Sequence, residues 1–410
     1  MTDHPGHGDR LTTKEAAQRL GVKPETVYAY VSRGLLTSHR SPSGRGSTFD
    51  TAEVDALAGK GRREPPGGDP LTRLRSGITL IDAGRYYFRG VDATALAQRH
   101  PYEEIADWLW TGTLRPGLRL IAPPGALSAA RRALAGMPPG SGPVDRMRVA
   151  AIAAAVADPL RFDLGRDSVL DSARALIPTL VDALPPLGPP PPADAPLASR
   201  LWPRLTAREP DPPSLRALDL ALALLIDHGM AASTVAVRVA ASARAHPYAA
   251  VSAGLGALDG PLHGAASGLA HRMLAEVLER GSAPAVVADH LRVSHPVPGL
   301  GHRLYPGSDP RADALFAALA DIPSAQATLT AAHQVAEVTA RQTSLHPNVD
   351  LALAALSVAS GMPSEAGETI FAVARTAGWI AHALEEYAEP PLRLRPTGPY
   401  TGPPPPQPLP

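Results

Sequence analysis

The spacing of apolar residues from residue 71 onward constrains this chain most strongly, because it predicts helices almost throughout. Behind a Pro-Pro-Ser start at 212–214, leucines recur at intervals of three and four residues, which places them on one helix face. These leucines are Leu215, Leu218, Leu222 and Leu225. Residues 145–157 and 366–386 have similar patterns. The body of the chain is therefore expected to be helical.

Aromatic residues are scarce, with 4 Trp, 9 Tyr and 5 Phe in 410 residues. Ala, Leu and Val must then fill the core, and these small side chains suit close helix packing. Strand signals are sparse: residues 78–82 and 86–88 could pair as a short hairpin around Ala83 and Gly84. We predict an all-α fold.

Charge and cysteine content exclude several classes of protein. The chain has 39 basic and 39 acidic residues, so it is not expected to be a wholesale polyanion binder. It has no cysteine, which excludes disulfides and thiolate chemistry. No His, Asp and Glu cluster has metal-ligand spacing, so no metal is expected. The N-terminal residues do not resemble a signal peptide, and the apolar runs are too short to span a membrane. We expect a soluble cytoplasmic protein.

Changes in composition divide the chain. Residues 1–10 are predicted to be a disordered terminus. Residues 11–58 form a compact head, and a hydrophilic stretch at 59–70 is a linker. Residues 403–410 are mostly proline and are predicted to be a proline-rich tail.

The head has the pattern of a helix-turn-helix. Thr12 or Thr13 can cap a first helix, Gly21 suits the turn, and Pro24 suits the start of a second helix. A loop rich in Ser, Gly and Arg at 38–47 lies where a wing would be. The residues expected to face inward are Ala16, Ala17, Leu20, Val27 and Val31. The head resembles the excisionase-like and MerR-type winged helix-turn-helix domains.

Two functions are open for the head, and the first is contact with DNA. Basic residues outnumber acidic ones and could hold phosphates. The second helix, 24–32, however has no Arg, Lys, Asn or Gln to read base edges. The alternative is a domain retained for assembly or protein contact. The candidate DNA-contact residues are Lys14, Lys23, Thr26, Tyr28, Arg33, Arg40 and Arg45.

The most specific motif lies at residues 298–311, which read PGLGHRLYPGSDPR. Its two Gly-x-Gly glycines permit close approach of the backbone to a ligand, and a histidine and an arginine follow. This stretch resembles the signature of the citrate synthases almost throughout. Other segments resemble further motifs of that family, in the family's order. They are residues 78–97, 227–234, 260–265, 348–350, 371–382 and 394–402.

The resemblance implies an architecture and a reaction. A large helical domain would comprise residues 71–265 and 363–402, and a small helical domain, 266–362, would close over the substrates. Citrate synthases condense acetyl-CoA with oxaloacetate and hydrolyse the product thioester, with no cofactor. That reaction needs a base for the acyl methyl group and a donor for the developing enolate oxygen.

Roles for individual residues follow from the same resemblance. Asp350 would be the base, His263 would meet the thioester oxygen, and His302 would polarise the oxaloacetate ketone. If His263 lies near a helix N-terminus, it would tend to be neutral. The oxaloacetate contacts would be His228, His302, Arg311, Arg375 and Arg395, because two carboxylates call for bidentate cations. The CoA contacts would be Val297, Pro298, Gly299, Leu300, Gly301 and Arg303.

In the family, the last of these arginines comes from the partner subunit, so the resemblance implies a homodimer whose site is completed by Arg395 of the partner. Asp227 is interpreted as a supporting residue rather than a catalyst, and His382 as a packing residue.

The sequence departs from the family's pattern in three places and leaves alternatives open. It reads HGAASG at 263–268 for the usual HGGANE, DHG at 227–229 for DHE, and GPVD at 142–145 for HPMD. None of these changes removes a proposed catalytic group. One alternative is a 2-methylcitrate synthase using propionyl-CoA, since one methylene is worth only about 1–3 kcal/mol in a pocket. Another is a DNA-binding regulator whose body senses oxaloacetate or acyl-CoA.

Overall fold

The computed structural model describes residues 10–20, 22–32, 34–40, 46–61, 74–260, 263–292, 296–395 and 401–407. The chain divides into two compact units, Met1–Asp69 and Pro70–Pro410. We call them the head and the body and describe each by itself.

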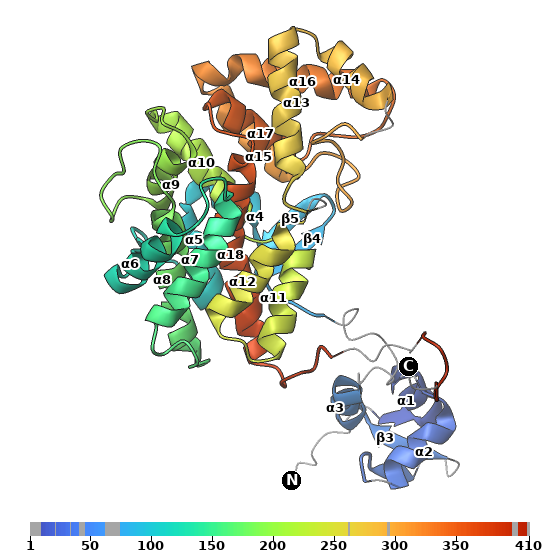
Figure 1. The fold of residues 1–410 in the computed structure, drawn as a ribbon. Coiled ribbons are helices and arrows are strands. Elements are labelled where there is room, and N and C mark those ends of the chain that lie inside the picture. Colours follow the sequence, from blue (N-terminus) through green and yellow to red (C-terminus); the bar gives the residue numbers. More distant parts are fainter. Residues whose placement is uncertain are drawn as a thin grey trace, which may run out of the picture. The chain divides into compact units, whose positions relative to one another are not determined.

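The head is a helix-turn-helix with a small antiparallel sheet of strand order β1-β3-β2 (Figure 1). Its elements are β1 (Arg10–Thr12), α1 (Thr13–Leu20), α2 (Pro24–Ser32), β2 (Ser38–Arg40), β3 (Ser47–Asp50) and α3 (Thr51–Gly61). Strands β2 and β3 pair where the wing was predicted, although residues 41–45 lie outside the described chain.

The local chemistry of the head matches its sequence pattern. Thr12 and Glu15 form a reciprocal capping box at α1: the Thr12 backbone N–H donates to Glu15 Oε2 at 2.8 Å, and the Glu15 N–H donates to Thr12 Oγ1 at 3.4 Å. The residues predicted to face inward all belong to one apolar cluster with Phe49 and Val54. Two boundaries differ from the prediction. Arg10 pairs with Asp50 in the sheet, and α3 extends to Gly61 into the predicted linker.

The body is helical apart from one small sheet, as predicted. Strands β4 (Thr79–Asp82), β5 (Arg85–Phe88) and β6 (Val91–Asp92) form it, in the order β4-β5-β6. The predicted hairpin is present, with Thr79 opposite Phe88 and the chain turning at Ala83 and Gly84. The third strand, β6, was not foreseen.

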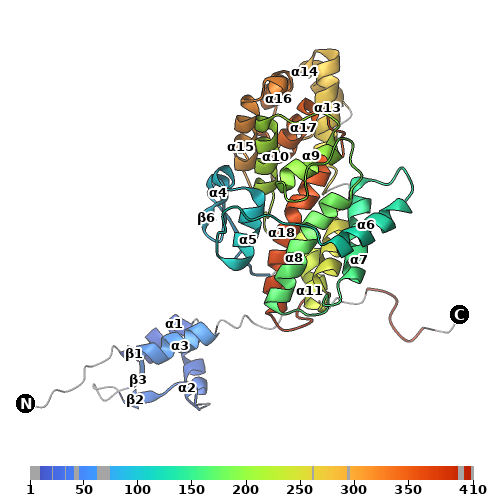
Figure 2. The same cartoon turned by 90° about the vertical axis from the view of Figure 1, so that its left-hand side faces the viewer.

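Most helices of the body pack around the long helix α18 (Ala366–Tyr387), which is drawn in red in Figures 1 and 2. In this part of the body the helices in contact with α18 are α5 (Tyr102–Thr111), α7 (Pro143–Ala157), α8 (Arg166–Ala183), α10 (Pro212–Leu224), α11 (Ala232–Ser242) and α12 (Pro247–Leu258). Helices α4 (Ala93–Arg99), α6 (Pro124–Ala135) and α9 (Leu197–Leu205) pack against these helices.

Five further helices gather at the other end of the body (Figure 1). They are α13 (Ala266–Arg280), α14 (Ala283–Arg292), α15 (Pro310–Ala320), α16 (Gln326–Ala340) and α17 (Val349–Ala359), with a short 3-10 helix, Pro323–Ala325, before α16. These helices lie within residues 266–362, and the existence of a separate small domain there, like its movement, stays a prediction.

Small residues let the central helix pack closely. A Cβ atom at Gly378 of α18 would lie 2.1 Å from the carbonyl oxygen of Ile226, and one at Gly254 of α12 would lie 2.9 Å from the Trp379 ring. The chain segment after α10 therefore touches α18 almost directly. Among the described residues, no helix has the length and hydrophobicity that crossing a bilayer requires.

Candidate active site

The body contains a cavity of about 510 Å³ that draws on segments far apart in the sequence. It is lined by the loop between α10 and α11, the turn before α13, the 298–311 motif, and the starts of α15 and α17. Two residues of α18, Phe371 and Arg375, complete it. Predicted residues that line it are His228, His263, His302, Arg303, Arg311, Asp350 and Arg375.

Asp350 reaches the cavity from the first turn of α17. Asn348 caps that helix, because its side chain accepts hydrogen bonds from the backbone N–H groups of Asp350 and Leu351. Burial raises the pKa of Asp350 to about 6, with Arg311 opposing the shift and Asp309 adding to it. The carboxylate is thus more basic than an ordinary aspartate and is still mostly ionised at neutral pH.

Arg311 lies in the first turn of α15 and is held by Asp309. Its Nε donates to Asp309 Oδ1 at 3.0 Å and its Nη2 donates to Oδ2 at 2.8 Å, with both side chains buried. Asp309 also caps α15 and accepts a hydrogen bond from the Val349 backbone N–H at 3.1 Å. One carboxylate therefore joins the starts of α15 and α17 and aligns Arg311 with Asp350.

His302 has a defined donor atom. The backbone N–H of Leu304 donates to His302 Nδ1 at 3.1 Å, so a neutral ring carries its proton on Nε2. Burial and the nearby Arg311 lower the pKa of His302, which favours this neutral form. The ring stands edge-on to His228, with 5.1 Å between centroids. His302 can therefore donate a hydrogen bond from Nε2 to a substrate oxygen.

His263 lies in the turn directly before α13, close to the N-terminus of that helix as anticipated. Its Nε2 is 2.8 Å from the Ser233 hydroxyl oxygen. Burial and Arg375 lower the pKa of His263, so the ring is neutral at neutral pH. A neutral ring near a helix N-terminus can act as a hydrogen-bond donor.

His228 and Arg375 are both more enclosed. The Nε2 atom of His228 is 2.7 Å from the Tyr305 hydroxyl oxygen, and burial together with the neighbouring arginines lowers the pKa of this histidine strongly. Arg375 donates from Nε to the Leu225 carbonyl at 2.9 Å and lies over the Phe371 ring. Burial lowers its pKa to about 10, which leaves it charged at neutral pH.

The predicted CoA segment is fixed by its backbone. Gly299 accepts from the Asn348 N–H, Gly301 donates to the His346 carbonyl, and Leu300 bridges Pro347. Gly299 and Gly301 have φ values of 78° and 80°, and a Cβ at Gly299 would lie 2.7 Å from Leu351. Of the six predicted CoA residues, Arg303 lines the cavity, and Val297, Pro298, Gly299, Leu300 and Gly301 do not.

Arg395 does not line the cavity of its own chain. It is exposed and follows α18 after a turn, with its backbone N–H bonded to the Leu392 carbonyl. This position is compatible with the prediction that it serves a partner subunit. Among the described residues there is no cluster of His, Cys, Asp and Glu that could hold a metal ion.

Sequence analysis gave Asp227 a supporting role but missed the polar partners of His382. Asp227 is fully buried and accepts hydrogen bonds from Thr79 Oγ1 at 2.5 Å and from the Gly229 N–H at 2.9 Å. His382 is not a simple packing residue, because its Nε2 is 3.2 Å from Asp227 and its Nδ1 is 3.1 Å from Arg238. Burial alone would raise the pKa of Asp227, but His382 and Arg375 lower it to about 2.

The candidate DNA-contact residues are only partly described. Lys14, Lys23, Tyr28 and Arg40 are exposed on the head, and Thr26 is half-buried on α2. Arg33 and Arg45 lie outside the described residues. The Tyr28 hydroxyl oxygen is 3.3 Å from Oγ1 of Thr13, the first residue of α1.

Comparison with known proteins places both parts of the chain in families. The family model "Citrate synthase, C-terminal domain" matches residues 70–397, and the family model "Helix-turn-helix domain" matches residues 10–62. A citrate synthase from Haloferax volcanii is 31% identical over 344 residues, covering 78% of this chain and 90% of the relative.

Solved structures agree. Citrate synthase from Thermotoga maritima matches with a TM-score of 0.67 and 27% identity, over 85% of this chain and 98% of that one. Citrate synthase from Thermoplasma acidophilum, in a ternary complex with carboxymethyl coenzyme A and oxaloacetate, has a TM-score of 0.67 and 25% identity, over 82% and 96% of the two chains. The fold and site define a citrate synthase-type transferase.

This chain belongs to the citrate synthase family. Ahead of that body it carries a helix-turn-helix domain.

Proposed function

We propose that the chain condenses acetyl-CoA with oxaloacetate and hydrolyses the product to citrate and CoA. The observation that carries this proposal is the cavity in which a basic carboxylate, two neutral histidines and two buried arginines meet. A carboxylate with a pKa of about 6 is a better base than an ordinary one, and neutral histidines can donate hydrogen bonds to developing oxyanions.

The first chemical step would be proton removal. Asp350 takes a proton from the acyl carbon next to the thioester carbonyl, and His263 donates to the carbonyl oxygen as negative charge develops there. If the Ser233 hydroxyl donates to His263 Nε2, the ring proton is on Nδ1 and is available for that donation. The products of this step are an enolate, whose oxygen accepts the hydrogen bond from His263, and a protonated Asp350.

The second step would form the carbon–carbon bond. The enolate carbon attacks the ketone carbon of oxaloacetate, while His302 Nε2 donates a hydrogen bond to the ketone oxygen. The alkoxide formed there gains one proton, which balances the proton taken by Asp350. Arg311 and Arg375 hold the two substrate carboxylates, with His228 as a further contact. Water then attacks the thioester, which releases CoA as a thiol and leaves a new carboxylate.

The active enzyme is proposed to be a homodimer with Arg395 completing the partner's cavity. Exposed apolar side chains support a contact surface: Ile152 and Val156 stand four residues apart on α7 with 57% and 72% of their surface exposed. The exposed position of Arg395, outside its own cavity, also favours this arrangement.

CoA release measured with a thiol reagent tests the proposal. The protein has no cysteine and so adds no background. Purified protein is given oxaloacetate with acetyl-CoA or with propionyl-CoA. Faster turnover with acetyl-CoA supports a citrate synthase, and faster turnover with propionyl-CoA supports a 2-methylcitrate synthase. A folded protein that binds oxaloacetate but releases no CoA with either would contradict the proposal and favour the sensing regulator.

The helix-turn-helix head supports a second function, DNA binding. Lys14, Lys23 and Arg40 are exposed on it and could contact phosphates, and Tyr28 on α2 is 49% exposed. A gel shift with DNA flanking the protein's own gene, with and without oxaloacetate, tests this function. Absence of a shifted band at low salt would contradict it.

A further inference from the structure

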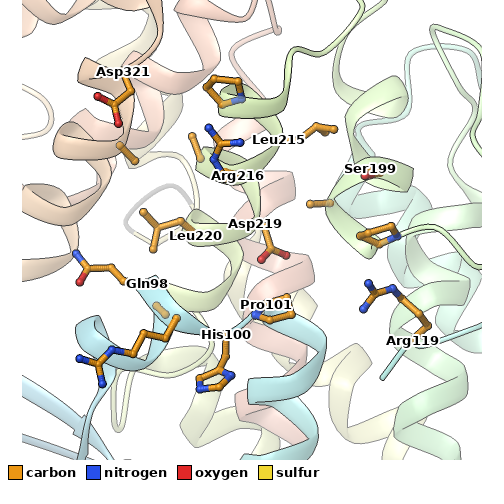
Figure 3. Close-up of a pocket in the computed structure, with 17 residues that line it drawn as sticks. Gln98, His100, Pro101, Arg119, Ser199, Leu215, Arg216, Asp219, Leu220 and Asp321 are labelled. Atoms are coloured by element: carbon orange, nitrogen blue, oxygen red, sulfur yellow. The ribbon is translucent and has the colours of Figure 1, made fainter. Parts of the chain in front are cut away.

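A second cavity of about 460 Å³ shares no lining residue with the candidate active site. It lies where the end of α4, the starts of α9 and α10, and the end of α15 come together (Figure 3). Leu215, Leu220, Pro213 and Ala318 give it an apolar wall. No step of the proposed reaction uses it.

Two opposite charges on α10 face this cavity without pairing. Arg216 and Asp219 are three residues apart, so they lie on one side of the helix, and both line the cavity (Figure 3). Arginine and aspartate at the same spacing do pair elsewhere, as in Arg174 with Asp171 at 3.2 Å. Within the described part of the chain, neither Arg216 nor Asp219 is within 4.0 Å of an oppositely charged side chain.

The Asp219 carboxylate is poorly compensated. Among the described residues, it accepts hydrogen bonds only from the Tyr102 backbone N–H, at 3.4 Å to each oxygen. Burial, together with the nearby Glu103 and Glu104, raises its pKa to about 7, against the opposing effect of the Tyr102 N–H and Arg119. A positively charged group placed beside Asp219 would therefore be stabilised.

We propose that this cavity binds a small zwitterion of the amino-acid class with an apolar side chain. The ligand's ammonium group contacts Asp219, its carboxylate contacts Arg216, and its apolar body packs on Leu215 and Leu220. A ligand of this kind satisfies both unpaired charges of α10 at once and buries apolar surface against the cavity wall.

The cavity and the candidate active site share two helices. Just after α10, the Leu225 carbonyl accepts the hydrogen bond from Arg375 Nε, and His228 follows three residues later. Helix α15 carries Arg311 in its first turn and Ala318 in its last. Tyr102, which contacts Asp219, also donates from its hydroxyl to the Val373 carbonyl at 3.0 Å. A zwitterion bound in this cavity therefore contacts α10 and α15, and these two helices help to position Arg375 and Arg311 of the candidate active site.

Titration calorimetry on the full chain tests the binding with three probes that share one carbon skeleton. L-Leucine carries both charges, 4-methylpentanoate carries only the carboxylate, and 3-methylbutylamine carries only the ammonium group. We expect L-leucine to bind at least about tenfold more tightly than either single-charge probe, because each of those probes lacks one of the two charged contacts.

Variants assign the contacts. Arg216→Ala should weaken L-leucine about tenfold or more and leave 3-methylbutylamine unchanged. Asp219→Asn, whose amide oxygen can still accept from Tyr102, should also weaken L-leucine about tenfold or more but leave 4-methylpentanoate unchanged. Arg132→Ala, an exposed arginine of α6 outside both cavities, is the matched control and should bind L-leucine normally. Thermal melting shows that each variant is folded.

Two results would overturn the proposal: no heat with L-leucine at millimolar concentration, or equal L-leucine affinity in wild type, Arg216→Ala and Asp219→Asn. The calorimetry needs no turnover, so its failure is separate from failure of the proposed reaction. If the protein releases CoA in the assay of the proposed function, L-leucine should shift the KM for oxaloacetate in wild type and in Arg132→Ala. It should not shift that KM in Arg216→Ala.

Discussion

Asp309 and Arg311 form a buried two-point ion pair, and the same aspartate accepts the backbone N–H of Val349 next to Asp350. One side chain thereby sets the relative position of the proposed oxaloacetate-binding arginine and the proposed base. The pair lies between the first turns of α15 and α17, so movement of either helix would disturb it.

Asp309→Asn should therefore impair stability and substrate binding together. Removing one partner of a buried ion pair costs about 3–5 kcal/mol, because the other charge stays buried. We expect a lower free energy of unfolding in urea and a higher KM for oxaloacetate. Asp313→Asn is the matched control, since Asp313 is exposed in the same first turn of α15. Equal behaviour of the two variants would contradict the role given to Asp309.

The rate should depend on the ionisation of Asp350. This aspartate must be ionised to accept a proton, and its pKa in the folded protein is about 6. CoA release should be constant above pH 7 and fall below pH 6, reaching about one-tenth at pH 5. Initial rates at saturating substrate, with thermal melting at each pH as the control, measure this. A rate that stays constant down to pH 4.5 would show that Asp350 titrates like an ordinary aspartate or is not the base.

Gly378 should be intolerant of a side chain. In Gly378→Ala the new Cβ atom would be placed 2.1 Å from the Ile226 carbonyl oxygen, so α18 must move away from the segment that carries Asp227 and His228. We expect a loss of about 2–3 kcal/mol in the free energy of unfolding and weaker oxaloacetate binding. Gly125→Ala on α6, where nothing lies within 4 Å of the new Cβ, should be neutral or stabilising. Similar unfolding curves for both variants would disprove the close contact.

DNA binding by the head should depend on Lys14 and Lys23. Replacing Lys14 and Lys23 with alanine should weaken DNA binding and reduce the slope of log affinity against log salt by about two. Arg19→Ala is the control, because Arg19 is paired with Asp55 at 2.7 Å. CoA release should be unchanged in both variants. An unchanged salt slope in the double-lysine variant would place the DNA contact elsewhere.

The helical body and its hairpin could be predicted from sequence because both depend on local patterns. Leucines at helical spacing and a Pro-Pro-Ser start mark α10, and the turn at Ala83 and Gly84 between two short segments marks the β4–β5 pair. The third strand, β6, was missed since two residues, Val91 and Asp92, carry almost no periodic signal.

The main cavity residues could also be predicted, because they lie in long family motifs. Their supports were missed where they join segments distant in sequence. The Ser233 hydroxyl meets His263 across 30 residues, and His382 reaches Asp227 across 155. No local pattern reports such contacts. Tyr305 and Asp309 were within the 298–311 motif, so their presence there was the available signal for a role at the site.

The most direct test of the central claim is Asp350→Asn. The variant keeps the shape of the side chain and the cap on α17 but has no carboxylate to accept a proton. We predict that CoA release from acetyl-CoA falls by at least about 100-fold. Oxaloacetate affinity, measured by calorimetry, should change by less than about threefold. A variant that retains most of the wild-type rate would contradict the assignment of Asp350 as the base.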